Sequence, residues 1–192
     1  MPLPAVVFFL CLVSLMPAPA SAGGDKRAAI GPAVGSDLGR LVSFRDQDGV
    51  VRDFASLKGE NGLILVFSRS LSWCPFCIAD ARDWSTIAED AWSKGVSIAV
   101  VTYDPVDVLS TFGRRFAIRY PLLSDKGSVV IKELEILNEE HSPGNVAYGI
   151  PHPMVFLLDA NGILRARFSE TNYTHRADKN EVLAEAARLG SK

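Results

Sequence analysis

Two cysteines separated by two residues, Cys74 and Cys77, are the part of this sequence with the clearest chemistry. Residues 62–67, an apolar stretch rich in branched side chains, precede them, and residues 78–95 follow with a pattern typical of a helix. A buried strand, a tight turn that carries C-x-x-C and a helix form the usual setting of a redox dithiol. The sequence therefore predicts a pair of thiols that cycles through a disulfide.

The predicted helix begins at this motif, which makes Cys74 the N-cap and Pro75 the first helical residue. Proline suits that position because the N–H that it lacks would have no partner inside the helix. The unpaired N–H groups and the helix dipole favour a negative charge at this end, and hence the thiolate form of Cys74. We expect Cys74 to be the attacking thiol and Cys77, one turn further on, to be the resolving thiol.

Other uses of a C-x-x-C pair agree less well with the chain. A structural disulfide would close a very short loop and stabilise the fold little. A zinc site needs about four ligands, and c-type haem attachment needs a histidine where Ile78 stands. A copper carrier, in which Cys74, Cys77 and a histidine hold Cu(I), is the non-catalytic alternative. For the enzyme we expect neither a metal nor an organic cofactor.

Residues 1–22 have the pattern of a signal peptide. They carry no charged side chain, and their apolar core ends in an A-x-A pattern at residues 20–22. The apolar run is shorter than the about 20 residues that a membrane-spanning helix needs. We predict cleavage and export to a bacterial periplasm, whereas an uncleaved segment would anchor the protein in the membrane. A single cysteine pair in an exported protein favours a redox role over a disulfide-stabilised scaffold.

The rest of the chain is predicted to be a short leader and one domain. Residues 23–37 have the Gly and Pro content of a flexible leader, and residues 38–192 have the length of one domain. The formal net charge of −2 does not indicate binding to nucleic acid or to an anionic membrane surface. Nothing in the sequence fixes the oligomeric state.

Within this domain, stretches typical of strands alternate with stretches typical of helices. The predicted strands are residues 41–44, 50–51, 62–67, 96–101, 154–158 and 163–168. The predicted helices are residues 54–58, 78–95, 106–118, 129–136 and 180–189, and residues 138–148 form a polar loop. This order predicts an α/β fold with a mixed central sheet flanked by helices and preceded by an N-terminal hairpin.

Four segments resemble the thioredoxin superfamily, and in particular its redoxin branch of AhpC/TSA peroxiredoxin-like and exported thioredoxin-like proteins. They are Trp73-Cys74-Pro75-Phe76-Cys77, Tyr103-Asp104, residues 120–125 and residues 149–162. The resemblance spans about residues 38–190 and implies a thioredoxin-like fold. We also expect Trp73 and Phe76 to form an apolar, substrate-binding rim around the dithiol.

The resemblance implies roles for residues outside the motif. Pro153, six residues before Asp159, is expected to form a cis peptide bond, to face the dithiol and to expose a backbone edge to the substrate. His152 either tunes the dithiol and steers the substrate or has no role. We interpret Asp80 as a solvated helix carboxylate, with a proton acceptor for Cys77 as the alternative.

Two reactions are compatible with such a dithiol. In the first, the protein exchanges disulfides with another protein or with a small-molecule thiol. In the second, it reduces a hydroperoxide and is regenerated by an external thiol. Peroxiredoxins carry T-x-x-C and an arginine six residues before the hairpin aspartate. Here these places hold Cys74 and Pro153, and the resemblance aligns Cys77 with the cysteine that attacks the peroxide. We therefore favour disulfide exchange, with peroxide reduction as the alternative.

Overall fold

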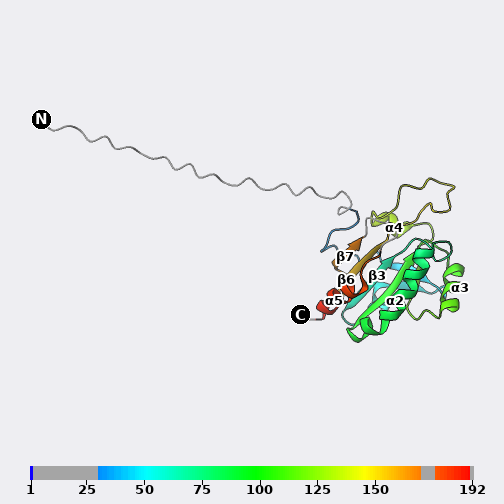
Figure 1. The fold of residues 1–192 in the computed structure, drawn as a ribbon, viewed down its shortest axis with the longest axis horizontal. Coiled ribbons are helices and arrows are strands. Elements are labelled where there is room, and N and C mark those ends of the chain that lie inside the picture. Colours follow the sequence, from blue (N-terminus) through cyan, green and yellow to red (C-terminus); the bar gives the residue numbers. More distant parts are fainter. Residues whose placement is uncertain (2–29, 170–175, 191–192) are drawn as a thin grey trace.

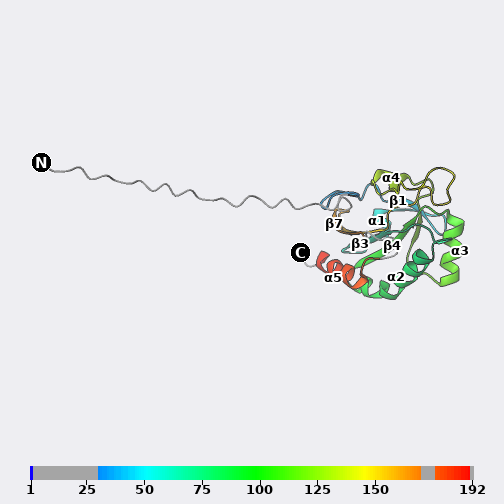
Figure 2. The same ribbon diagram turned by 45° about the horizontal axis from the view of Figure 1, so that its top comes forward.

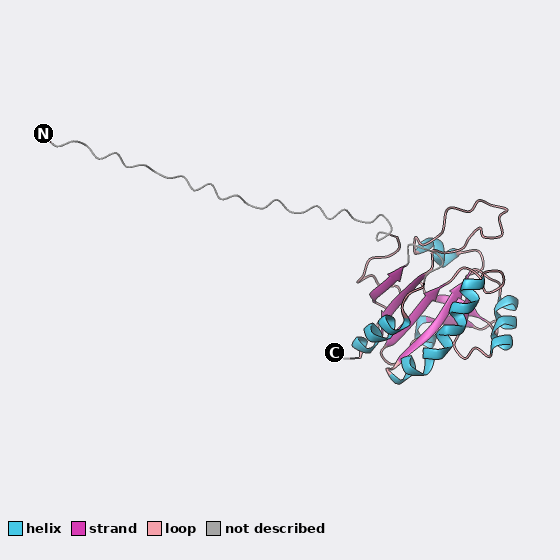
Figure 3. Cartoon of the chain, in the orientation of Figure 1, coloured by secondary structure: helices cyan, strands magenta, loops and turns pink. Residues whose placement is uncertain are grey.

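The computed structural model describes residues 1, 30–169 and 176–190. These residues form a seven-stranded sheet with helices on both faces (Figures 1 and 3). Along the chain the elements are β1 (Ser43–Asp46), β2 (Val51–Asp53), α1 (Phe54–Leu57), β3 (Gly62–Phe67), α2 (Pro75–Ser93), β4 (Val96–Thr102), α3 (Val106–Phe116), β5 (Leu122–Ser124), α4 (Val129–Glu133), β6 (Met154–Asp159), β7 (Leu164–Ser169) and α5 (Lys179–Leu189).

The sheet has mixed strand directions, in the order β2-β1-β5-β4-β3-β6-β7. Strands β3, β4 and β5 run parallel, and every other neighbouring pair is antiparallel. The β1–β2 hairpin is the predicted N-terminal extension and lies beside β5 at one edge. The predicted α/β class with a mixed, helix-flanked sheet is therefore confirmed.

Strand β3 lies in the interior of the sheet, between β4 and β6, and is buried along its whole length. Alternate side chains of a strand point to opposite faces, and Ile64 and Val66 belong to the core cluster that includes residues of α2, α3 and α5. Leu63, Leu65 and Phe67 belong to the second cluster, with residues of α1 and α4. Figure 2 shows these two helical layers. Because helices cover both faces, the strand reads as a continuous apolar run.

Residues 30–38 lie against strand β7. The Arg167 guanidinium donates hydrogen bonds to three successive carbonyl oxygens, those of Ile30, Gly31 and Pro32. Further along, backbone hydrogen bonds join residues 35, 36 and 38 to residues 162 and 164. The last part of the predicted flexible leader is thus bound to the sheet edge.

The predicted signal peptide and the start of the leader fall, apart from Met1, on residues outside those the structure describes. None of the helices in the described part of the chain is long and apolar enough to cross a membrane.

Two hairpins of the sheet are closed by the same arrangement of side chains. In the first, one carboxylate oxygen of Asp46 accepts two backbone N–H groups of the turn, and the other accepts Arg52 Nε at 2.7 Å. In the second, Asp159 makes the same contacts with its own turn and with Arg165. Burial raises the pKa of the Asp46 carboxyl, but the hydrogen bonds from Arg52 and the turn outweigh it, so the net shift is downward.

A lowered pKa in the folded state means that the Asp46 carboxylate stabilises the fold above its unfolded-state pKa. That contribution is lost as the pH falls through the folded-state pKa. We expect Asp46→Asn to reduce the free energy of unfolding by about 1–2 kcal/mol at neutral pH. The difference from the unmodified protein should narrow as the pH falls below about 4. Urea denaturation at pH near ~7 and ~3 measures both effects.

The exposed carboxylate in the same turn provides the control. The Asp48 side chain is exposed and makes no hydrogen bond to the described residues. Asp48→Asn should therefore change the free energy of unfolding little. A loss in Asp46→Asn that is equally large at both pH values would contradict the assigned role of the ionised carboxylate.

Candidate active site

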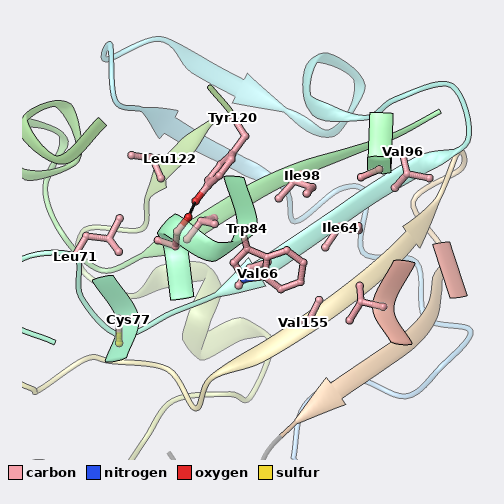
Figure 4. Packing of buried hydrophobic residues seen from close by; sticks show 14 of the residues in the cluster. Ile64, Val66, Leu71, Cys77, Trp84, Val96, Ile98, Tyr120, Leu122 and Val155 are labelled. Carbon is pink, nitrogen blue, oxygen red and sulfur yellow. Dashed lines mark hydrogen bonds between the residues drawn. The ribbon is translucent and has the colours of Figure 1, made fainter. Parts of the chain in front are cut away.

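The two cysteines lie at the start of helix α2, after the loop that follows strand β3. Cys74 is the N-cap of α2 and Pro75 is the first helical residue, as predicted. A disulfide joins Cys74 to Cys77, their Cα atoms are 5.2 Å apart, and Cys74 Sγ accepts the Cys77 N–H at 3.2 Å. Both residues have an exposed fraction of 0%. Figure 4 shows Cys77 at the end of the core cluster that contains Leu71 and Trp84.

Two arginines from distant parts of the chain face the two sulfurs. Arg69, in the loop between β3 and α2, donates from Nη2 to Cys74 Sγ at 3.2 Å. Arg176, just before α5, donates from Nη2 to Cys77 Sγ at 3.5 Å. A guanidinium beside a cysteine sulfur stabilises its thiolate. The prediction from sequence missed both residues, although Arg69 stands only five positions before Cys74 in the same loop.

Asp80 is buried, which corrects its prediction as a solvated carboxylate; its exposed fraction is 5%. Its Oδ1 accepts Lys179 Nζ at 2.8 Å, and its Oδ2 accepts Trp84 Nε1 at 3.2 Å. Oδ2 also lies 3.6 Å from Arg176 Nε. The helical spacing explains the burial, because Asp80 lies three residues after Cys77 and four before Trp84, on the inward face of α2.

Asp80 therefore fixes Arg176 beside Cys77. Burial lowers the pKa of the Arg176 guanidinium, the charge of Asp80 raises it and the charge of Arg69 lowers it further, with a net downward shift. Because the two guanidinium groups donate to the two sulfurs of one disulfide, they share one site. Arginine stays protonated in proteins, so both remain positively charged.

A buried carboxylate holds the loop that carries Arg69 and leads to Cys74. Asp104, at the end of β4, accepts Ser70 Oγ at 2.8 Å, Leu71 N at 2.7 Å and Thr102 Oγ1 at 3.0 Å. Burial raises the pKa of Asp104, and these hydrogen bonds only partly oppose the shift. Asp104 belongs to the segments that resemble the family, but its sequence pattern alone did not indicate this role.

The two aromatic residues of the predicted apolar rim, Trp73 and Phe76, differ in exposure. Trp73 is half-buried, and its Nε1 donates to the Tyr103 hydroxyl at 2.9 Å. That hydroxyl in turn donates to the carbonyl of Val146, which ties the loop before β6 to Trp73. Phe76 is 46% exposed. The surface next to the dithiol thus has one fixed and one exposed aromatic side chain.

The remaining predicted site residues lie at the start of β6. No peptide bond in the described segments is cis, so the predicted cis bond at Pro153 is wrong. X–Pro bonds prefer trans by about 0.5–1 kcal/mol, and spacing alone does not specify the isomer. Pro153 does line a small pocket together with Asp80 and Arg176. His152 lines a separate pocket, which includes Glu140.

The buried ion pairs of Asp80 lead to a test of stability. Asp80→Asn leaves two largely buried cations without their carboxylate, so we expect the free energy of unfolding to fall by about 2–3 kcal/mol. Urea denaturation measures the loss. Asp83→Asn, on the exposed face of the same helix, is the matched control. A loss no larger than that of the control would show that Asp80 does not anchor α5.

Taken together, the site can cycle between a disulfide and a dithiol. The helix N-terminus and two guanidinium groups stabilise negative charge on sulfur when the disulfide is opened. In the described ranges there is no group of three or more His, Cys, Asp or Glu side chains that could hold a metal ion.

The sequence is similar to peroxiredoxins of the AhpC/TSA family. The model of the AhpC/TSA family matches residues 40–167. Peroxiredoxin Bcp of Escherichia coli strain K12 is 24% identical over 147 residues, which are 77% of this chain and 92% of that protein. Peroxiredoxin Q of Suaeda salsa chloroplasts is 24% identical over 123 residues, which are 64% of this chain and 54% of that protein.

Solved structures show the same fold. Peroxiredoxin Q of Xanthomonas campestris is 18% identical, with a TM-score of 0.67 over 83% of this chain and 98% of that one. Peroxidoxin BcpB of Mycobacterium tuberculosis is 19% identical, with a TM-score of 0.64 over 84% of this chain and 96% of that one.

Proposed function

The chain belongs to the AhpC/TSA family, and we propose that this thiol-dependent oxidoreductase reduces hydroperoxides. The proposal gives Cys74 the attacking role and Cys77 the resolving role. It reverses the preference for disulfide exchange reached from the sequence. That preference depended on two missing groups, the threonine and the arginine that polarise the peroxide in peroxiredoxins.

The contact between Arg69 and Cys74 carries the proposal. The arginine position of the family pattern holds Pro153, but a guanidinium from a different loop lies 3.2 Å from the attacking sulfur. A cation at this place stabilises the thiolate and the negative charge that develops on the peroxide oxygens. Arg69 thus supplies the function of the missing arginine from another position.

The reaction proceeds in two steps on the protein. The Cys74 thiolate attacks one peroxide oxygen, the O–O bond breaks, and the released alkoxide or hydroxide takes up a proton and leaves as an alcohol or water. This leaves Cys74 as a sulfenic acid. Cys77 then attacks the Cys74 sulfur and the hydroxyl departs as water, which forms the disulfide. An external thiol returns both cysteines to the reduced state.

Asp80 acts in this scheme through Arg176. Its carboxylate oxygens are already engaged with Lys179, Trp84 and Arg176. We therefore assign it as a positioning residue that holds Arg176 beside Cys77, in place of the proton-acceptor role considered from the sequence.

Disulfide exchange stays the second candidate, because the C-x-x-C pair forms the intramolecular disulfide that such exchange requires. The complete burial of Cys74 and Cys77 favours a small substrate over a disulfide held in a folded protein. The copper-carrier alternative needs two free thiols and a nearby histidine, and no observation on the described residues favours it.

The rate of oxidation by peroxide tests the proposal. We expect the reduced protein to react with hydrogen peroxide in stopped flow far faster than a free thiolate does. Arg69→Gln should slow this reaction at least about tenfold, because one charge-stabilising donor is lost. Arg165→Gln, on the distant β6–β7 hairpin, is the control. A rate in the unmodified protein no higher than that of a free thiolate would leave disulfide exchange as the function.

The cysteine variants test the assigned roles. Cys74→Ser should abolish peroxide consumption. Cys77→Ser should still react with one equivalent of peroxide and stop at a sulfenic acid, which a dimedone adduct detects by mass spectrometry. Full reactivity in Cys74→Ser would instead assign the attack to Cys77.

A further inference from the structure

The side-chain hydroxyl of Ser68 is buried and has no hydrogen-bond partner among the described residues. The residue has an exposed fraction of 2% and directly follows β3. Its backbone N–H donates to the carbonyl of Val101 at 2.9 Å, so it continues the pairing of β3 with β4. Buried polar groups in proteins nearly always have a partner, because leaving one unsatisfied is costly. The fold alone therefore does not explain why a hydroxyl stands at this position.

Ser68 lies at the end of the sheet where the dithiol is. The antiparallel register of β3 with β6, continued by one residue beyond its last pair, puts Ser68 opposite Pro153. Pro153 lines the same small pocket as Arg176, which donates to Cys77 Sγ at 3.5 Å. The register of two strands thus brings Ser68 to the surroundings of Cys77.

The Ser68 side chain points to the face of the sheet that α2 covers. Alternate residues of a strand share a face, and Val66 lies in the core cluster that contains Cys77. Because α2 connects the parallel strands β3 and β4, it runs back along β3 and begins near the end of that strand. Val66 lines a pocket with Asp80, so Ser68, two residues further along the strand, meets α2 about one turn nearer its start. Cys77 lies there, three residues before Asp80, and is fully buried.

Reduction supplies an acceptor for this hydroxyl. In the disulfide the Cys77 sulfur is neutral and bonded to Cys74, and a neutral sulfur is a weak acceptor. When a thiol attacks Cys74 and the S–S bond breaks, the electron pair of that bond stays on Cys77, which leaves as a thiolate. We propose that Ser68 donates a hydrogen bond to this thiolate and so stabilises the dithiol relative to the disulfide. Hydrogen bonds to an ionised acceptor are about twice as strong as those between neutral groups.

The same contact acts in the other direction of the cycle. Cys77 attacks the Cys74 sulfur as a thiolate when the disulfide forms. Ser68 stabilises that attacking form without itself taking up or releasing a proton. The inference goes beyond the proposed function, because it concerns the dithiol itself. It applies equally to disulfide exchange, since both candidate reactions pass through the Cys74–Cys77 disulfide.

Removal of the hydroxyl should affect the two redox forms differently. In the disulfide form, Ser68→Ala removes a buried hydroxyl without a partner among the described residues, so stability in urea should stay the same or rise. In the reduced form it removes a hydrogen bond, so stability should fall. The equilibrium constant for reduction by dithiothreitol should therefore decrease about tenfold, as measured by alkylation and mass spectrometry. Equilibrium is approached from both the oxidised and the reduced protein, so slow access to the buried cysteines does not affect the result.

Two further variants separate the hydrogen bond from a general effect on packing. Ser68→Thr keeps the hydroxyl and should keep the equilibrium constant near that of the unmodified protein. Ser128→Ala is the matched control, because Ser128 has the same exposed fraction of 2% but lies at the start of α4, on the other face of the sheet. Its hydroxyl donates to the carbonyl of Gly149, so its removal should weaken both redox forms alike and leave the constant unchanged.

Three results would overturn the inference. They are an unchanged equilibrium constant in Ser68→Ala, an equal loss of stability in its two redox forms, and a shift in Ser68→Thr as large as that in Ser68→Ala. None of these measurements uses peroxide. A protein inert to peroxide would therefore refute the proposed function without deciding this result, and a failure here would leave the proposed function standing.

Discussion

The active site depends on one buried carboxylate, that of Asp104. It stands at the end of β4 and binds the loop that follows the neighbouring strand β3, so it connects two parallel strands at the edge where the site lies. The loop that it fixes carries Arg69 and delivers Cys74 to the start of α2. Three donors around one carboxylate offset part of the cost of burying it. The pairing of β3 with β4 therefore contributes to the placement of Arg69 beside Cys74, as the C-x-x-C motif does.

Local signals in the sequence were sufficient for the parts of the site that are local in the chain. The apolar run of β3, the N-cap at Cys74 and the proline after it all depend on neighbouring residues, and the structure confirms them. Helix ends were predicted to within a few residues. The family resemblance is confirmed as well, and with it the mixed, helix-flanked sheet of the thioredoxin-like fold.

The errors concern side chains whose partners are distant in the sequence. Asp80 lies on the apolar face of α2, but its charge led to the prediction that it is exposed to solvent. Its burial is stabilised by Arg176 and Lys179, which reach it only because α5 packs against α2. Arg176 belongs to a polar stretch without periodicity, and its place at Cys77 follows from that same packing. The isomer of the bond before Pro153 is likewise a tertiary property, because the intrinsic preference between the two forms is small.

Strand β7 ends the sheet on one side, and an edge strand offers unpaired backbone groups to any other chain. Here residues 35–38 of the same chain pair with part of that edge, and Arg167 donates a hydrogen bond to the carbonyl of Ile30. At the opposite edge β2 has no such cover among the described residues, and Val51 is exposed there. A domain boundary drawn at residue 38, where the apolar pattern begins, would therefore remove the protection of β7 against intermolecular strand pairing. The folded unit therefore begins before residue 38, since Ile30 also packs against the core.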